Sequence, residues 1–159
     1  MPYHRKGYSV LTIKDLSITR GQGEQSFTVS LPHLSLAEGE VVSLCGSSGC
    51  GKSTLLEMMG LILKPDNLSQ YELSSDTLSM DLAPLILSNN QKTLAEIRSK
   101  NLGFMLQNGG LLPFLSVWKN ILLPCQTNGI LADESWLHHL CEKLNINHLM
   151  TKYPKQLSI

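Results

Sequence analysis

Apolar and polar positions alternate along two stretches near the start of the chain. These are SVLTIKDLSITR (residues 9–20) and FTVSLPHLSL (residues 27–36), with the glycine-rich GQGEQ between them. Apolar and β-branched residues at near-alternate positions predict strands, and the glycine turn predicts an antiparallel pair. The continuous apolar run VVSLCG (residues 41–46) comes next. Such a run is typical of a strand buried on both faces.

The spacing becomes helical from Lys52 onward. Apolar residues recur at helical intervals until Lys64 and Pro65, which predicts that the helix ends there. Residues 66–90 are rich in Ser, Asp and Asn with weak alternation only, and we expect irregular strand and loop. QKTLAEIRSK (residues 91–100) predicts a short helix, and NLGFMLQ (residues 101–107) predicts another strand.

Two capped helices are predicted in the last third of the chain. Ser116 can cap a short helix, VWKNILL, which Pro124 should end. Asp133 can cap a second helix that carries an apolar face. The residues of that face are Leu137, Leu140, Cys141 and Leu144.

Composition narrows the class of protein. A chain of 159 residues with 42% hydrophobic residues can bury one core, so we expect a single domain. Thirteen basic residues balance thirteen acidic ones, which argues against a nucleic-acid partner. The four cysteines form no CxxC pair and no metal-ligand spacing with the histidines, so a reduced, intracellular chain is the simpler interpretation. The sequence predicts neither a signal peptide nor a membrane-spanning run.

The stretch GSSGCGKST matches the phosphate-loop pattern GxxxxGK[ST], between a predicted buried strand and a predicted helix. Its glycines let backbone N–H groups turn toward phosphate oxygens, and the helix start adds its own N–H groups. We expect Lys52 to reach the β and γ phosphates of ATP and Ser53 to bind Mg²⁺, with Thr54 closing the loop. The predicted nucleotide-binding residues are Gly46, Ser47, Ser48, Gly49, Cys50, Gly51, Lys52, Ser53 and Thr54.

A glycine-rich turn that binds nothing is the alternative for this stretch. Four fixed positions match by chance in roughly one chain in a hundred or fewer, since glycine makes up about 7% of residues. The flanking strand and helix lower that figure further. Cys50 could be a reactive thiol at a helix start, but a small residue at a variable motif position is the simpler interpretation.

With the loop in place, NLGFMLQ followed by NGGLLPFLSVWKNILLP resembles the Q-loop region of ABC transporter ATPases, especially the lipoprotein-releasing and macrolide-exporter branch. The resemblance covers nearly the whole chain. It implies an α/β P-loop NTPase fold with an N-terminal antiparallel β subdomain. It also implies that Gln107 contacts Mg²⁺ or the attacking water, which would make Lys52 and Gln107 the catalytic candidates.

The resemblance also bears on the last residues, YPKQLSI. Tyr153, Pro154, Gln156, Leu157 and Ser158 match the lead into the LSGGQ signature, where Ile159 replaces the first glycine. We therefore expect residues 1–159 to be a single incomplete ABC ATP-binding domain. The strand with the Mg²⁺-linked aspartate, the water-polarising glutamate and the switch histidine would be absent. We expect negligible ATPase activity, and we expect 41–45 to lack its neighbouring strands.

The family implies further partners and a location. A transmembrane permease subunit and a second ATP-binding domain are the expected partners, on the inner face of the cell membrane at its cytoplasmic side. The aromatic residue that the family places near the adenine is replaced by Arg20, a candidate base contact. We interpret Tyr8 and Phe27 as packing residues.

The histidines and the first tryptophan of the predicted helices give no clear indication of a functional site. His138 and His139 fall on the polar side of the last helix, and exposed surface residues explain them better than a metal or catalytic site. Trp118 is either a partner contact or a core residue.

Two other function classes stay open. One is a non-catalytic module that binds nucleotide or a membrane partner without turnover. The other is a small-molecule kinase. Two features argue against a kinase: about 45 residues of strand-like sequence precede the loop, and no arginine-rich lid follows it.

Overall fold

The computed structural model describes residues 9–74, 79–106 and 109–157. The chain divides into two compact units, Met1–Leu102 and Gly103–Ile159. The interpretation of residues 1–159 as one incomplete domain stays a prediction.

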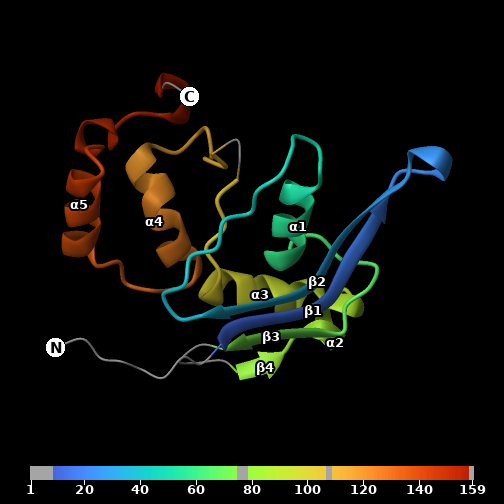
Figure 1. The fold of residues 1–159 in the computed structure, drawn as a ribbon. Helices are drawn as coiled ribbons and strands as arrows, with labels where there is room; N and C mark the ends of the chain where they lie inside the picture. Colours follow the sequence, from blue (N-terminus) through green and yellow to red (C-terminus); the bar gives the residue numbers. More distant parts are fainter. Residues whose placement is uncertain (1–8, 75–78, 107–108, 158–159) are drawn as a thin grey trace. The chain divides into compact units, whose positions relative to one another are not determined.

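The first unit begins with the predicted antiparallel hairpin. Strand β1 (Ser9–Arg20) pairs with strand β2 (Phe27–Ala37), and the short 3₁₀ helix η1 (Gly23–Gln25) lies in the turn, drawn in blue in Figure 1. Asp15 has a positive φ of 54°, which interrupts the alternation of the strand. As a result Ile13 and Leu16, three positions apart, are both buried.

Two further strands complete an antiparallel sheet where we expected irregular structure. Strands β3 (Gln70–Ser74) and β4 (Ser79–Asp81) give the order β2-β1-β3-β4. β1 supplies the partner, since Ile13 pairs with Leu34 on one side and with Tyr71 on the other. The weak alternation of Tyr71 with Leu73 was the only signal for β3, and both side chains are buried.

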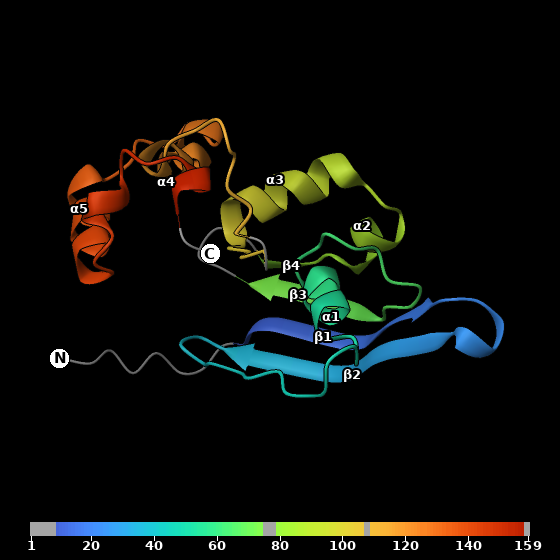
Figure 2. The same cartoon turned by 90° about the horizontal axis from the view of Figure 1, so that it is seen from above.

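Three helices cover this sheet and share one hydrophobic core with it (Figure 2). They are α1 (Lys52–Met59), α2 (Ala83–Leu87) and α3 (Gln91–Asn101). α1 and α3 confirm the predicted helices, whereas α2 was not predicted. The fully or nearly fully buried core residues include Ile13, Leu16, Met58, Tyr71 and Leu82.

α1 ends five residues before Lys64, where the apolar spacing predicted its end. Leu61 adopts a left-handed conformation with a φ of 58°. The Ile62 N–H donates to the Glu57 carbonyl at 2.9 Å, and the Leu61 N–H donates to the Met58 carbonyl at 3.1 Å. These two bonds form a Schellman motif, which closes a helix irrespective of the apolar pattern beyond it.

The strand predicted for VVSLCG is wrong. Residues 40–47 form no helix or strand, Val41 is 93% exposed, and Val42 and Leu44 are also exposed. The four-stranded sheet of the described residues does not extend to this segment. An apolar run without a neighbouring ladder has no acceptor for its N–H groups, so it cannot form a strand.

The strand predicted for NLGFMLQ is also wrong over its described residues. Asn101 belongs to α3, and Gly103–Leu106 carry no helix or strand. Met105 is 92% exposed, and Phe104 and Leu106 are exposed as well. Gln107 lies outside the described residues. As with VVSLCG, no strand of the described residues pairs with residues 103–106.

The second unit contains α4 (Val117–Thr127), α5 (Glu134–Lys143) and the short 3₁₀ helices η2 (Asn147–Leu149) and η3 (Pro154–Gln156). Both predicted caps are confirmed: the Lys119 N–H donates to Ser116 Oγ, and the Trp136 N–H donates to Asp133 Oδ1. Of the predicted α5 face, Cys141 is buried, Leu137 and Leu140 are half-buried, and Leu144 is exposed.

Pro124 does not end α4, as we had predicted, but lies inside it. The helix runs on for three residues, and side chains bond the carbonyls near its end. Thr127 Oγ1 donates to the Leu123 carbonyl at 3.0 Å, and Asn128 Nδ2 donates to the Pro124 carbonyl at 2.8 Å. In the part of the chain that the structure describes, no helix is long and apolar enough to cross a membrane.

Candidate functional site

The phosphate-loop stretch leads directly into α1, as the sequence predicts. Gly49 has a φ of 80° and Gly51 a φ of 96°, both in the left-handed region that glycine adopts without strain. Gly51 is the residue that precedes the helix, and a Cβ built on it would lie 2.4 Å from Val29 Cγ2 of β2. Only glycine therefore lets the start of α1 lie this close to the sheet.

Lys52 folds back into the loop that precedes it. Its Nζ donates to the Gly46 carbonyl at 2.8 Å and to the Ser47 carbonyl at 2.7 Å, and it lies 3.7 Å from Cys50 Sγ. The loop therefore closes around the lysine ammonium group. This arrangement holds one positive charge against the loop backbone, where a phosphate group could share it.

The start of α1 adds donors beside this charge. The first helical bond joins the Leu55 N–H to the Gly51 carbonyl at 2.9 Å, so the N–H groups of Lys52, Ser53 and Thr54 precede the helical ladder. Unpaired N–H groups and the positive end of the helix dipole favour an anion at this point. Ser53 is the second residue of the helix and is exposed, so its hydroxyl can serve as an oxygen ligand for Mg²⁺.

The remaining loop residues surround the same point. Ser47 and Ser48 are exposed, and the Cys50 N–H donates to the Ser47 carbonyl at 3.4 Å. A Cβ on Gly46 would meet Cys50 Sγ at 2.7 Å, so Gly46 and Cys50 lie on opposite sides of the loop in contact range. The structure thus brings Gly46, Cys50 and Lys52 together, as expected for a phosphate cradle.

Arg20 and Phe27 face each other across the hairpin, at the ends of β1 and β2. Phe27 is 48% exposed, so its interpretation as a packing residue is wrong. The residues of β2 at positions 27 and 29 share one face of the strand, and Val29 is the contact of Gly51. Phe27 therefore lies on the loop's side of the hairpin. Tyr8 and Gln107 lie outside the described residues.

The other candidate side chains are not part of this site. His138 stacks on Trp118 with ring centroids 4.8 Å apart, and His139 stacks on Trp136 at 5.6 Å. Trp118 is half-buried and the two histidines are exposed. The searched part of the chain, residues 9–74, 79–106 and 109–157, contains no group of three metal-ligating side chains.

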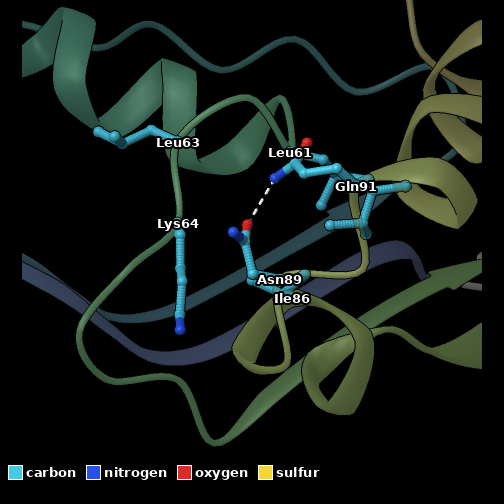
Figure 3. Close-up of a pocket in the computed structure, with 7 residues that line it drawn as sticks. Leu61, Leu63, Lys64, Ile86, Asn89 and Gln91 are labelled. Atoms are coloured by element: carbon cyan, nitrogen blue, oxygen red, sulfur yellow. Dashed lines mark hydrogen bonds between the residues drawn. The ribbon is translucent and has the colours of Figure 1, made fainter.

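A crevice beyond the C-terminal end of α1 is packed rather than open (Figure 3). Asn89 and Gln91 lie at its rim, where Gln91 Nε2 donates to Asn89 Oδ1 at 2.6 Å. The apolar residues Leu61 and Leu94 line it, and it has no room for a water molecule. The crevice is a packing seam and offers no ligand site.

A glycine-rich loop that closes around a lysine at the start of a helix, beside a β-sheet, defines the P-loop class of nucleotide-binding folds. The family model described as ABC transporter matches residues 30–159. The chain belongs to the ABC transporter family. This confirms the predicted family and the α/β P-loop fold class.

Two curated relatives of this chain are ATP-binding proteins of lipoprotein-releasing systems. The chain is 35% identical over 126 residues to the LolD protein of Cytophaga hutchinsonii, a match that covers 78% of this chain and 53% of the relative. It is 33% identical over 151 residues to the LolD protein of Leptospira interrogans, covering 94% of this chain and 59% of that relative.

A solved structure has the same fold. It is described as a dimeric post-hydrolysis state of the ATP-binding cassette MJ0796 bound to ADP and Pi. The TM-score is 0.70 at 28% sequence identity, and the match covers 93% of this chain and 63% of that one. The chain thus spans between half and two thirds of the length of these matched proteins.

Proposed function

We propose that this chain supplies the phosphate-binding part of the ATP-binding subunit of an ABC transporter. The observation that carries the proposal is the position of Lys52, whose ammonium group is bonded to the Gly46 and Ser47 carbonyls of the loop before it. Lys52 would hold the β and γ phosphates of ATP together with the loop N–H groups. In the whole protein, ATP binding and hydrolysis would drive export or extraction of a substrate at a membrane.

Mg²⁺ fits the residues present at the start of α1. Mg²⁺ keeps several waters and takes a few hard oxygen ligands, and the exposed Ser53 hydroxyl beside Lys52 supplies one of them. The metal would neutralise charge on the transferred phosphate. Gln107 stays a second proposed contact of Mg²⁺ or of the attacking water, and with Lys52 a proposed catalytic residue.

The base of the nucleotide would lie toward the turn end of the β1–β2 hairpin. Arg20 is exposed there, opposite Phe27. A guanidinium plane and an aromatic ring both stack on purines. We retain Arg20 as the proposed adenine contact and add Phe27 because it is exposed on the same face as Val29, which touches the loop.

Three further proposals concern ATP hydrolysis, the partner proteins and the location at the membrane. The family resemblance assigns the acidic strand and the switch histidine to sequence beyond the signature, so we propose that these 159 residues alone bind ATP without hydrolysing it. We further propose a transmembrane permease subunit and a second ATP-binding domain as partners, on the cytoplasmic face of the cell membrane. The MJ0796 neighbour is described as dimeric, which supports the second partner.

Equilibrium binding of a fluorescent ATP analogue with Mg²⁺ tests the proposal. Lys52→Ala should weaken binding about tenfold or more, because hydrogen bonds to a charged group are among the strongest. Lys92→Ala removes the same charge from an exposed position at the start of α3 and serves as the matched control. Equal affinity of wild type and Lys52→Ala would overturn the proposal.

Two further arms examine the metal and the turnover. Chelation of Mg²⁺ by EDTA should weaken binding by wild type and should have little effect on Ser53→Ala, which lacks the proposed ligand oxygen. The rate at which the wild-type chain releases inorganic phosphate from ATP should be no higher than that of Lys52→Ala. Measurable turnover by the 159-residue chain would refute the proposed absence of hydrolysis.

A further inference from the structure

The C-terminal end of α1 is bonded by two side chains from distant parts of the first unit. The Tyr71 hydroxyl, on β3, donates to the Met59 carbonyl. Arg98 Nη1, on α3, donates to the Leu61 carbonyl at 2.5 Å. These donors are 12 and 37 residues away in sequence, so the bonds join α1 to β3 and to α3.

These bonds satisfy carbonyl groups that a helix end leaves without helical partners. Tyr71 is fully buried, and its burial raises the pKa of the phenol, which keeps the hydroxyl protonated and able to donate. Arg98 is half-buried, and its guanidinium carries N–H donors and no acceptor. Both side chains can therefore donate to carbonyls at the end of the helix.

The Arg98 bond holds a backbone conformation that leucine rarely adopts. Leu61 has a φ of 58°, and for a side chain with a Cβ this conformation costs about 1 kcal/mol or more. Leu61 is 2% exposed and belongs to the core. Burial of its side chain and the bond from Arg98 together offset the strain and fix the point where the helix ends.

The other end of α1 is held as well. Gly51 lies against Val29 of β2, and Lys52 is bonded to the loop carbonyls. α1 has eight residues, which correspond to roughly 12 Å of helix. A helix this short moves as a rigid body, so a displacement of its C-terminal end changes the position of Lys52 at its start.

We propose that Tyr71 and Arg98 are positioning residues for the phosphate loop, acting through α1. The inference rests on the proposed function, because the loop must bind phosphate for its position to affect affinity. The hydrogen bonds of both side chains go to the C-terminal end of α1, to the Met59 and Leu61 carbonyls. Their effect is to set where the first turn of α1, with its N–H groups and Lys52, stands relative to β2.

Measuring both the affinity and the number of binding sites distinguishes a role in positioning the phosphate loop from a role in stabilising the fold. Tyr71→Phe and Arg98→Lys should each raise the Kd of the Mg²⁺-bound ATP analogue about fivefold, the equivalent of one hydrogen bond. A purely structural role would lower the folded fraction, and with it the number of sites, at unchanged Kd. Ile97→Val shortens a buried side chain on α3 without removing a hydrogen bond, and its Kd should equal that of wild type.

A second measurement needs no nucleotide. Amide hydrogen exchange of Leu55, whose N–H donates to the Gly51 carbonyl, and of the α1 amides that follow it should accelerate in Tyr71→Phe and Arg98→Lys, relative to α3 amides of the same variant. The positioning role is refuted if Kd and these exchange rates match wild type in both variants. Absence of binding in wild type would instead contradict the proposed function, and the exchange rates would still decide the role of Tyr71 and Arg98.

Discussion

Strand β3 and the segment Val41–Cys45 reverse what their sequences predict. Val41–Cys45 is a continuous apolar run, yet it forms no strand and Val41 is 93% exposed. β3 has a weak pattern, yet Tyr71 within it is fully buried. The difference is the neighbour, because β3 pairs with β1 on one side and with β4 on the other. An apolar pattern supplies the drive for burial, but a hydrogen-bonded partner decides whether a strand forms.

Proline substitution should give the largest difference in unfolding free energy between a paired strand and the unpaired segment. Over residues 11–14, β1 has β2 on one side and β3 on the other, so each N–H there faces a neighbouring strand. Ile13→Pro removes a ladder bond and a buried side chain, and it should cost at least about 3 kcal/mol of unfolding free energy. Val42→Pro removes no ladder bond and should change it by less than about 0.5 kcal/mol. Chemical denaturation of both variants measures the contrast.

The same pair of variants can break the comparison. If Val42→Pro costs as much as Ile13→Pro, the segment Val41–Cys45 pairs with a strand in solution. Repeating Val42→Pro in a longer ABC protein context would sharpen the result, because a strand partner supplied there should make the substitution costly.

Alkaline titration should report the burial that pairing gives to Tyr71. The pKa of Tyr71 is raised in the folded state, so the protonated phenol contributes stability that is fully present below pH 10, near the unfolded pKa. That contribution is lost as the pH rises further, by about 1.4 kcal/mol per pH unit. The loss measured between pH 10 and 11 should be smaller in Tyr71→Phe than in wild type.

Tyr153→Phe is the control for this titration, because Tyr153 lies in the second unit and is 44% exposed. An identical slope in wild type and Tyr71→Phe would mean that the phenol of Tyr71 ionises freely, and that the core does not bury it as the structure indicates.

The contrast also explains which parts of the fold could be predicted from the sequence. The β1–β2 hairpin was predicted because its two strands and their turn are consecutive, so the partner is present in the pattern itself. β3 and Val41–Cys45 were mispredicted because their pairing depends on residues far away. The end of α1 was missed for another reason: Leu61 takes a conformation that favours glycine, and no residue type signals it.

The candidate site divides in the same way. The order of residues from Gly46 to Thr54 predicts a loop before a helix, and the glycine conformations agree with that pattern. Phe27 was misjudged because its exposure depends on where α1 covers the hairpin, which is a tertiary property. Tyr71 and Arg98 give no local signal, since the carbonyls that they bond lie 12 and 37 residues away.

The cap of α4 is the opposite extreme, because it depends on local sequence alone. Ser116 Oγ accepts the Lys119 N–H at 3.3 Å within one helical turn. Ser116→Ala should therefore destabilise α4 by about 1 kcal/mol whether or not any distant strand is present. Ser135→Ala, at the exposed second residue of α5, removes a hydroxyl that is not the cap of its helix, since Asp133 caps α5, and should cost much less.

Hydrogen exchange of the first α4 amides measures this smallest effect. Faster exchange in Ser116→Ala but not in Ser135→Ala would show that the caps are set by their own neighbours in sequence. Equal exchange in the two variants would mean that the start of α4 depends on the bonds of Val117 and Trp118 to the Lys152 and Met150 carbonyls. In that case the helix would need distant partners as β3 does, and its correct prediction from the sequence would not rest on the cap.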